Sequence, residues 1–248
     1  MKLMPGKKVI FAIPVYNEAR TLKPQIIKLQ NFIKKNIPSR FHTTILIASN
    51  GSTDSTFKIA QELRNNSDNV EILNLESKGF GLAVKESFLY QDAEYFGYFD
   101  LDFSTPLEYI NKALEMLENQ NCSVVNGTRL HKESIVRNRS IIRTSTSRIF
   151  NWIIKKIFKT QFTDGMCGFK FFNKKDVEKL FQNNLISSDK WFFSTETLIL
   201  CELNNLLIEE LPLIWTNDKN SKVKIFQLSL EYLQEILNLK KRMKNDRN

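Results

Sequence analysis

The sequence contains little cysteine and no long uncharged apolar run. Its three cysteines, Cys122, Cys167 and Cys201, lack the spacing of a zinc site or a disulfide framework, so we expect core thiols in a reducing compartment. No stretch of about 18 uncharged apolar residues occurs, which argues against a transmembrane helix. The N-terminus does not resemble a signal peptide. We therefore expect a cytoplasmic protein without a membrane span of its own.

Histidine is also scarce, whereas positive charge is abundant and unevenly placed. The chain of 248 residues has a net charge of +9. Residues 129–159 hold nine Lys or Arg and one acid, residues 219–248 hold eight against three acids, and the remainder is net negative. Two segments thus carry the basicity, and both predict anionic partners: phosphates, anionic lipids or nucleic acid.

The first half of the chain alternates short apolar strands with helical segments. Strands are expected at 9–13, 44–48, 70–75, 95–101 and 123–126. The intervening helices are expected to begin at a cap on Asn17, at a cap on Thr53 or Asp54, after the KGFG turn and at Pro106. This alternation predicts an α/β fold with a Rossmann-like, mostly parallel central sheet flanked by helices on both faces.

The second half is less regular. Helices are expected at 140–158, 194–203 and 223–244, and apolar strands at 169–172 and 206–215. No repeat, low-complexity tract or linker divides the chain. We expect a single domain over residues 1–248, with a nucleotide-binding half at about 8–105, an acceptor half at 106–222 and a C-terminal amphipathic helix at 223–244.

Four polar motifs follow the predicted strands at their carboxyl ends. They are PVYNE at 14–18, SNGSTD at 49–54, KGFG at 78–81 and DLD at 100–102. In open α/β sheets, ligands bind beyond the carboxyl ends of the strands. The coincidence predicts one ligand site at this edge of the sheet.

The DLD motif places two carboxylates at the end of an apolar strand. If the backbone stays extended through Leu101, Asp100 and Asp102 lie on the same side of it. Two neighbouring carboxylates repel unless a cation joins them. Mg²⁺ or Mn²⁺ takes one or two carboxylates and completes its shell with water and phosphate oxygens, which suits a metal-bound diphosphate. The alternative is a solvated turn that caps the next helix.

These motifs carry a family resemblance. PVYNE, then Gly51-Ser52-Thr53-Asp54, then Asp100-Leu101-Asp102 resemble family-2 glycosyltransferases with a GT-A fold. The later DGMCGFK at 164–170 and WFFSTE at 191–196 resemble the branch that includes dolichyl-phosphate mannose and glucose synthases. The resemblance covers about residues 8–224. It implies an inverting, metal-dependent transfer of a hexose from a UDP- or GDP-sugar to a polyprenyl phosphate.

The resemblance also implies roles for single positions, which fall into three groups. The implied nucleotide-sugar ligands are Pro14, Tyr16, Glu18, Ser49, Asn50, Lys78, Asp100, Leu101, Asp102 and Lys222. The implied metal ligands are Asp100 and Asp102, with Ser104 nearby. The implied contacts of the acceptor phosphate are Arg129, Arg143 and Ser147.

The acceptor decides whether the reaction needs a base. A sugar hydroxyl needs a general base to become nucleophilic. A phosphate monoester, with a second pKa of about 6, is already anionic at pH 7 and needs cations instead. If a base is used, Asp164 is the first candidate and Glu196 the second. Each also has a structural interpretation, in its glycine turn and in its helix respectively.

Two positions depart from the family pattern. Ser49 stands where relatives often have an aspartate that accepts hydrogen bonds from the base ring, which leaves the nucleotide open. Ser194 stands where relatives often have another aspartate, so one carboxylate of that motif is missing.

Alternatives stay open at this stage. A family-2 enzyme that glycosylates a sugar hydroxyl is the main one, and a non-enzymatic basic module that binds nucleic acid or membrane is the other. The latter would leave the strand-end motifs without a role, so we expect no nucleic-acid partner. Helix 140–158, with Trp152 beside basic residues, is expected to lie on an anionic membrane surface or to pack with a solvated cationic face. The tail helix is expected to pack on the core, or to dock on a membrane or a partner. Because no membrane span is expected, a separate membrane subunit is a candidate partner of the protein.

Overall fold

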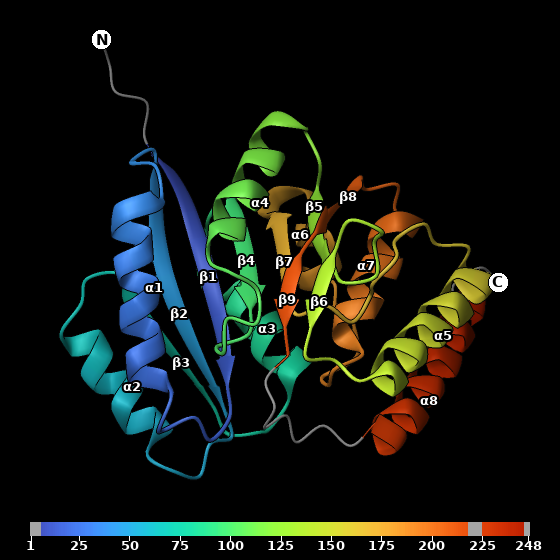
Figure 1. Ribbon diagram of the computed structural model, residues 1–248, viewed down its shortest axis with the longest axis horizontal. Helices are drawn as coiled ribbons and strands as arrows, with labels where there is room; N and C mark the ends of the chain where they lie inside the picture. The colour runs from blue at the N-terminus through green and yellow to red at the C-terminus, as the bar shows by residue number, and fades with distance from the viewer. Residues whose placement is uncertain (1–5, 218–224, 246–248) are drawn as a thin grey trace.

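A central sheet of seven strands organises the computed structural model, which describes residues 6–217 and 225–245 (Figure 1). The order across the sheet is β3-β2-β1-β4-β7-β5-β8. In chain order, these strands are β1 Lys7–Val15, β2 Phe41–Asn50, β3 Val70–Leu75, β4 Tyr95–Phe99, β5 Val124–Thr128, β7 Phe169–Asn173 and β8 Ile208–Pro212. A separate parallel pair is formed by β6 Ile135–Arg137 and β9 Ile214–Thr216.

All neighbouring strands of the large sheet are parallel except around β7, which runs antiparallel to both β4 and β5. The sequence-based expectation of a mostly parallel sheet is therefore confirmed. The middle of β1, from Val9 to Ile13, is buried throughout. Such a continuous apolar run is typical of a parallel strand covered on both faces.

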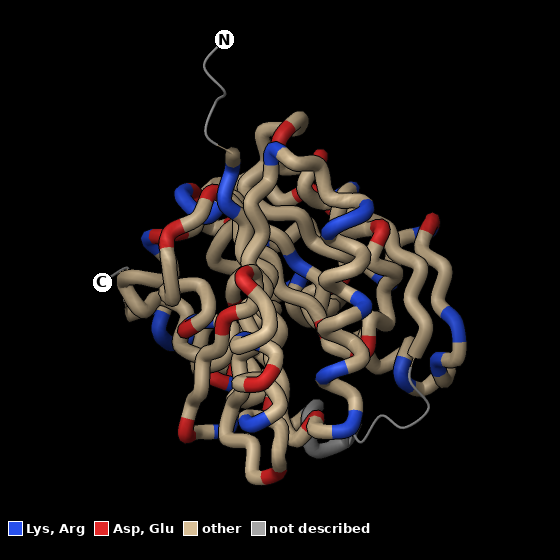
Figure 2. The backbone as a smooth tube through the Cα atoms, turned by 90° about the vertical axis from the view of Figure 1, so that its left-hand side faces the viewer, with Lys and Arg blue, Asp and Glu red and all other residues tan. Residues whose placement is uncertain are grey.

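Helices cover both faces of the sheet. They are α1 Leu22–Asn36, α2 Thr56–Asn65, α3 Phe80–Leu89, α4 Glu108–Asn119, α5 Ile141–Phe158, α6 Lys174–Gln182, α7 Phe193–Leu203 and α8 Ile225–Asn245. One apolar core lies under α1, α2 and α4, and a second lies under α3 and α5 to α8. Seen from the side of α1 and α2, basic and acidic residues are interspersed (Figure 2). By contrast, the sequence of α5 contains Lys and Arg but no acid.

Helices α1 and α2 begin later than the sequence predicts. Asn17 was expected to cap the first helix, but it adopts a left-handed φ of 55° and α1 begins only at Leu22. The Oδ1 of Asn17 instead accepts a hydrogen bond from the Thr53 backbone N–H at 2.8 Å. The cap expected at Thr53 or Asp54 is also displaced, because α2 begins at Thr56 after Ser55. These residues join the ends of β1 and β2 instead.

Two further predictions of local structure were wrong, and two elements were missed. The strand expected at 95–101 ends at Phe99, and the chain then turns. The strand expected at 206–215 is divided between β8 in the large sheet and β9 in the small one. Neither α6 nor β6 was predicted. The division between β8 and β9 arises because β9 pairs with β6, which is distant in sequence. A local sequence pattern carries no information about such a pairing.

The C-terminal helix α8 packs on the protein core. Tyr232, Ile236 and Leu239 are buried, and the Tyr232 ring meets the Phe150 ring of α5 edge to face, with 4.7 Å between their centroids. Helices α5 and α8 therefore lie side by side, as Figure 1 shows at the right of the molecule. Among the described residues, no helix is long and apolar enough to cross a membrane.

The packing of α8 can be tested by a matched pair of substitutions. Tyr232→Ala should lower the free energy of unfolding by about 3 kcal/mol, because it empties a buried aromatic site. Leu237 lies on the same helix and is 64% exposed. Leu237→Ala should therefore change the free energy of unfolding by less than about 0.5 kcal/mol. Urea denaturation followed by tryptophan fluorescence measures both. Equal effects of the two substitutions would contradict the packing of α8.

Candidate active site

The ends of β1 and β2 and the turn after β3 are bound together by Asn50. Its Nδ2 donates to the Val15 carbonyl at 2.9 Å, and its Oδ1 accepts from the Gly79 N–H at 3.3 Å. The Nζ of Lys78 lies 3.8 Å from the centroid of the Tyr16 ring. The PVYNE, SNGSTD and KGFG motifs therefore meet at one edge of the sheet, as their spacing predicted.

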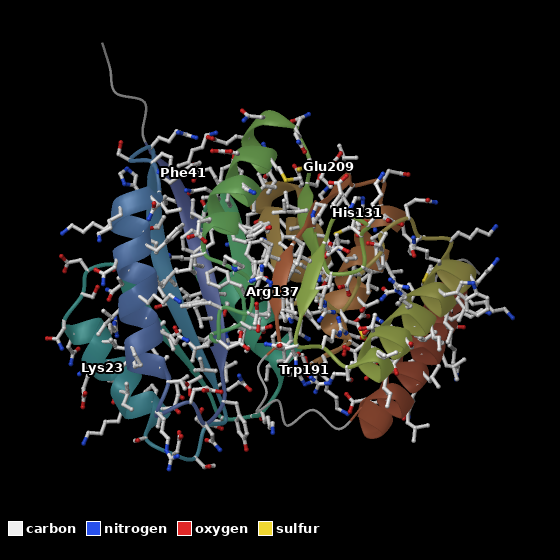
Figure 3. The ribbon with its side chains drawn as sticks, in the orientation of Figure 1. Lys23, Phe41, His131, Arg137, Trp191 and Glu209 are labelled. Atoms are coloured by element: carbon white, nitrogen blue, oxygen red, sulfur yellow. The ribbon has the colours of Figure 1, made fainter. Side chains whose placement is uncertain are left out.

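The other residues expected to contact the nucleotide sugar lie at the same edge. Pro14 is partly buried in β1, beside Ala48 of β2. The Glu18 carboxylate accepts a hydrogen bond from the Thr21 hydroxyl. Ser49 is fully buried, and its Oγ has no hydrogen-bond partner within the described structure. Figure 3 places Trp191 near this lower edge and Phe41, at the start of β2, at the opposite one.

Asp100 and Asp102 lie in a tight turn rather than on an extended strand. The Phe103 N–H donates to the Asp100 carbonyl at 3.2 Å, and Phe103 has a left-handed φ of 48°. The Asp102 carboxylate accepts from both the backbone N–H and the hydroxyl of Ser104, at 2.9 and 2.8 Å. Ser104 thus orients Asp102, which is exposed, while Leu101 is buried beneath the turn.

Gly168 makes room for the Asp100 carboxylate. A Cβ atom at this position would lie 2.4 Å from Asp100 Oδ2. Burial and the neighbouring charge of Asp102 raise the pKa of Asp100 to about 7. A divalent cation would relieve this repulsion, so the donor set fits Mg²⁺ or Mn²⁺ held by two carboxylates and phosphate oxygens. Within residues 6–217 and 225–245, no group of three or more His, Cys, Asp or Glu could hold a metal alone.

A buried ion pair lies beside this turn. Arg129, at the end of β5, binds Asp164 in a bidentate manner, with Nε–Oδ2 2.7 Å and Nη2–Oδ1 3.0 Å. The backbone N–H groups of Arg129 and Met166 donate to the same carboxylate. Burial alone would raise the pKa of Asp164, but Arg129 outweighs it and lowers that pKa. This arrangement disfavours the role of general base that the sequence suggested for Asp164.

Arg139 is the residue that the sequence interpretation missed. Its Nη2 donates to the buried Oγ of Ser147 at 2.6 Å, whereas its Nη1 is buried without a hydrogen-bond partner in the described structure. Burial and the charge of Arg129 lower the pKa of Arg139 to about 10. The only signal in the sequence was its place in the basic segment, directly before the Ser140 cap of α5.

The other two residues expected at the acceptor phosphate lie on α5 near Arg139. Ser147 is buried and receives the hydrogen bond from Arg139. The Nη1 of Arg143 donates to the Asn217 side chain at 3.3 Å. Lys222 lies outside the described residues.

Ser194 belongs to a buried network around Lys170. The Lys170 ammonium donates to the Ser194 hydroxyl at 2.8 Å and to the carbonyls of Cys167 and Gly165. The Tyr98 hydroxyl also donates to Ser194, at 3.0 Å. Because all three acceptors of Lys170 are uncharged, burial lowers its pKa to about 8. The serine therefore fills a hydrogen-bonding position, without the charge that an aspartate would bring.

Glu196 is held in a buried cluster between α7, α8 and the segment before α7. Its fully buried carboxylate accepts from the backbone N–H groups of Ser187 and Ser188, at 3.2 and 2.8 Å. It also pairs with Arg242 of α8. The described structure therefore does not bring Glu196 together with Asp100 or Arg129.

The comparison with known families gives the same assignment as the strand-end geometry. The model of the family described as Glycosyl transferase family 2 matches residues 10–181. The chain belongs to this family. It is therefore a glycosyltransferase, with the α/β GT-A fold that its motifs predicted.

Relatives and solved structures resemble this glycosyltransferase over most of its length. It is 27% identical over 238 residues to a dolichyl-phosphate beta-glucosyltransferase of Dictyostelium discoideum, covering 92% of this chain and 72% of that protein. It is 24% identical to glycosyltransferase AglD of Haloferax volcanii, covering 94% of this chain but 37% of that protein. Its fold matches glucosyl-3-phosphoglycerate synthase of Mycobacterium tuberculosis, solved with Mn²⁺, UDP and phosphoglyceric acid (TM-score 0.68, 12% identity, 95% and 79% of the two chains).

The repulsion between the two aspartates of this glycosyltransferase predicts a measurable pKa change. Asp102→Asn removes the like charge, so the pKa of Asp100 should fall below about 7. Since the folded-state pKa of Asp100 exceeds the unfolded value of about 3.9, its contribution to stability falls as pH rises between them. The variant should weaken that dependence. Carboxyl ¹³C NMR titration measures the pKa directly, and an unchanged value would show that Asp102 exerts no charge effect.

Proposed function

We propose that the protein transfers a hexose, with inversion, from a UDP- or GDP-sugar to a polyprenyl phosphate. The observation that carries this proposal is a cluster of three arginines beside the DLD turn. Arg129, Arg139 and Arg143 form this cluster, which we call the arginine group. The Nη2 of Arg139 donates to the Arg143 carbonyl at 3.5 Å and to the Ser147 hydroxyl at 2.6 Å. Burial and the positive charges of Arg129 and Arg143 contribute to lowering the pKa of Arg139. Asp164 pairs with Arg129, so this carboxylate is already occupied.

A phosphate would complete the hydrogen bonding of this group. A buried donor that lacks an acceptor costs about 1–3 kcal/mol, and the Nη1 of Arg139 is such a donor among the residues that the structure describes. Guanidinium groups bind phosphate oxygens through strong, charge-assisted hydrogen bonds. The Ser147 hydroxyl beside it supplies a further polar contact. The acceptor-phosphate contacts are thus Arg129, Arg139, Arg143 and Ser147.

The same geometry disfavours a sugar hydroxyl as the acceptor. That reaction needs a carboxylate free to take a proton. Asp164 is held by Arg129, and Glu196 is held by Arg242 and two backbone N–H groups. A phosphate monoester already carries a negative charge at pH 7, so its oxygen can attack the anomeric carbon without a base. The bond from that carbon to the diphosphate breaks, and the nucleoside diphosphate leaves.

The donor would lie across the ends of β1, β2 and β4. Asn50, Lys78 and Tyr16 line its nucleotide side, and the Asp100–Asp102 turn lies at its diphosphate. Asp100 and Asp102 would hold Mg²⁺ or Mn²⁺, which supplies charge stabilisation to the leaving diphosphate. The protein itself contributes mainly the alignment of the two substrates. The names of the dolichyl-phosphate relatives favour glucose as the sugar.

Product analysis tests this function. Purified protein would be incubated with Mn²⁺ or Mg²⁺, UDP- and GDP-hexoses and a short-chain polyprenyl phosphate. We expect a sugar-linked lipid that extracts into organic solvent and is absent with Asp102→Ala. Transfer to a sugar hydroxyl, with no lipid product, would favour the alternative acceptor.

Two arginines separated by one residue provide a matched test of the acceptor site. Arg139→Ala should raise the KM for the lipid phosphate about 10- to 100-fold, because it removes charged hydrogen bonds worth about 1.5–3 kcal/mol, while the donor KM stays unchanged. Arg137→Ala, at an exposed position of β6, should leave both constants unchanged. Steady-state kinetics with each substrate varied measures them, and equal behaviour of the two variants would contradict the role of Arg139.

We also propose that the protein is cytoplasmic and associates peripherally with a membrane through the apolar face of α5. This face consists of Ile141, Ile142, Ile149 and Trp152, all more than half exposed. Arg148 and Lys156 beside them are exposed and positively charged. An apolar strip flanked by cations suits an anionic bilayer surface, and it would place the arginine group near a lipid-borne phosphate. A separate membrane subunit is the alternative occupant.

Vesicle binding tests this face with two matched isoleucines. Ile149→Ala should weaken binding to vesicles that contain anionic lipid at least about fivefold, because it removes apolar carbon atoms that would enter the bilayer. Ile27→Ala, an exposed isoleucine on α1, should have no effect. Cosedimentation with vesicles of defined composition measures both. Binding to neither anionic nor neutral vesicles would favour the membrane subunit.

A further inference from the structure

Glu196 is the centre of a buried cluster that joins α7, α8 and the segment before α7. Its carboxylate receives hydrogen bonds from the backbone N–H groups of Ser187 and Ser188 and from the Ser187 hydroxyl. The Nη2 of Arg242 pairs with the same carboxylate, and the Nη1 of Arg242 donates to the Leu185 carbonyl at 3.2 Å. One arginine of the last helix therefore holds both Glu196 and the segment 185–190.

The other side of this segment packs directly on the turn that follows β3. The Leu82 N–H donates to the Asp189 carbonyl at 3.1 Å. A Cβ atom at Gly79 would lie 2.6 Å from the Asp189 carbonyl oxygen, and one at Gly81 would lie 2.6 Å from that of Ser188. The two glycines of KGFG are therefore needed because backbone approaches backbone here. This is a physical reason for the motif that the sequence alone did not supply.

Side chains strengthen the same contact. Lys85 of α3 forms an ion pair with Asp189. The rings of Phe80 and Trp191 are stacked, with 4.4 Å between their centroids. On the far side, Lys190 pairs with Glu231 of α8 at 3.4 Å. The segment 185–191 thus lies between α8 and the start of α3.

The turn that it supports is part of the donor site. Lys78 precedes Gly79 and lies over the Tyr16 ring, and Gly79 donates to Asn50. A displacement of segment 185–190 would therefore move the backbone that carries Lys78. The path from Arg242 to Lys78 consists of direct contacts at every step.

We propose that Glu196 and Arg242 are positioning residues that fix the nucleotide site through the segment 185–190. The ion pair between Arg242 and Glu196 couples the packing of α8 on the core to binding of the donor nucleotide. The inference rests on the proposed use of a nucleotide sugar. We thus assign Glu196 a positioning role instead of the general-base role that the sequence suggested. Its carboxylate already binds two backbone N–H groups, a hydroxyl and a guanidinium.

Three variants and a matched control test the coupling. Arg242→Ala should weaken binding of UDP or GDP, each with Mn²⁺, about fivefold to twentyfold, which is the lower part of the usual range of coupling between sites. Arg242→Lys keeps the charge and should recover part of the loss. Glu196→Gln should raise the donor KM and leave kcat within about twofold. Arg64→Ala removes a surface ion pair with Glu71 and should change nothing. Isothermal titration calorimetry and steady-state kinetics measure these effects.

Hydrogen exchange separates failure of this inference from failure of the proposed function. The Leu82 amide should exchange faster in Arg242→Ala than in the wild type or Arg64→Ala, whether or not any nucleotide binds. If the wild type binds neither UDP nor GDP, the proposed function fails, and this exchange still tests the contact path. Unchanged nucleotide affinity or unchanged Leu82 exchange in Arg242→Ala would overturn the inference. So would a more than about hundredfold loss of kcat at constant KM in Glu196→Gln, which indicates a base. If Arg242→Ala does not fold, Arg242→Lys and Glu196→Gln carry the test.

Discussion

The buried ion pair between Arg129 and Asp164 is the interaction on which the rest of the site depends. It joins the end of β5 to the turn before β7, the one strand that runs antiparallel within the large sheet. Removing either partner would leave an unpaired buried charge, which typically costs about 3–5 kcal/mol. Because both Asp164 oxygens already accept hydrogen bonds from Arg129 and from backbone N–H groups, this carboxylate does not take a proton readily. The pair therefore fixes the local geometry and also determines which chemistry remains possible.

The charge balance leads from this pair to the function. Arg139 donates to the Ser147 hydroxyl and has one guanidinium nitrogen buried and unpaired among the described residues. On the other side, burial and repulsion by Asp102 raise the pKa of Asp100 to about 7, so both carboxylates are fully ionised near neutral pH only when a cation joins them. A protein that places surplus positive and surplus negative charge next to each other can bind an anion and a cation together. A phosphate acceptor and a metal-bound diphosphate donor satisfy both requirements, and neither needs a protein base.

Much of this arrangement could be predicted from the sequence because it depends on local order along the chain. The alternation of strands and helices gave the mostly parallel sheet, and the position of each polar motif after a strand gave the common edge. The insertion of β7 between β4 and β5, the division of β8 from β9 and the turn at Asp100 could not be predicted, since they depend on contacts distant in sequence. Arg139 was one of nine basic residues in its segment, and only its burial distinguishes it. Glu196 matched a motif, but its partner Arg242 lies 46 residues away.

Direct binding of the acceptor tests the central claim, that the arginine group is a site for a phosphate monoester. Isothermal titration calorimetry would compare a short, water-soluble polyprenyl phosphate with the corresponding alcohol at two salt concentrations. The account predicts that the phosphate binds, that its affinity falls as salt rises, and that the alcohol shows no comparable binding. Equal binding of phosphate and alcohol, or an affinity for the phosphate that does not depend on salt, would contradict it.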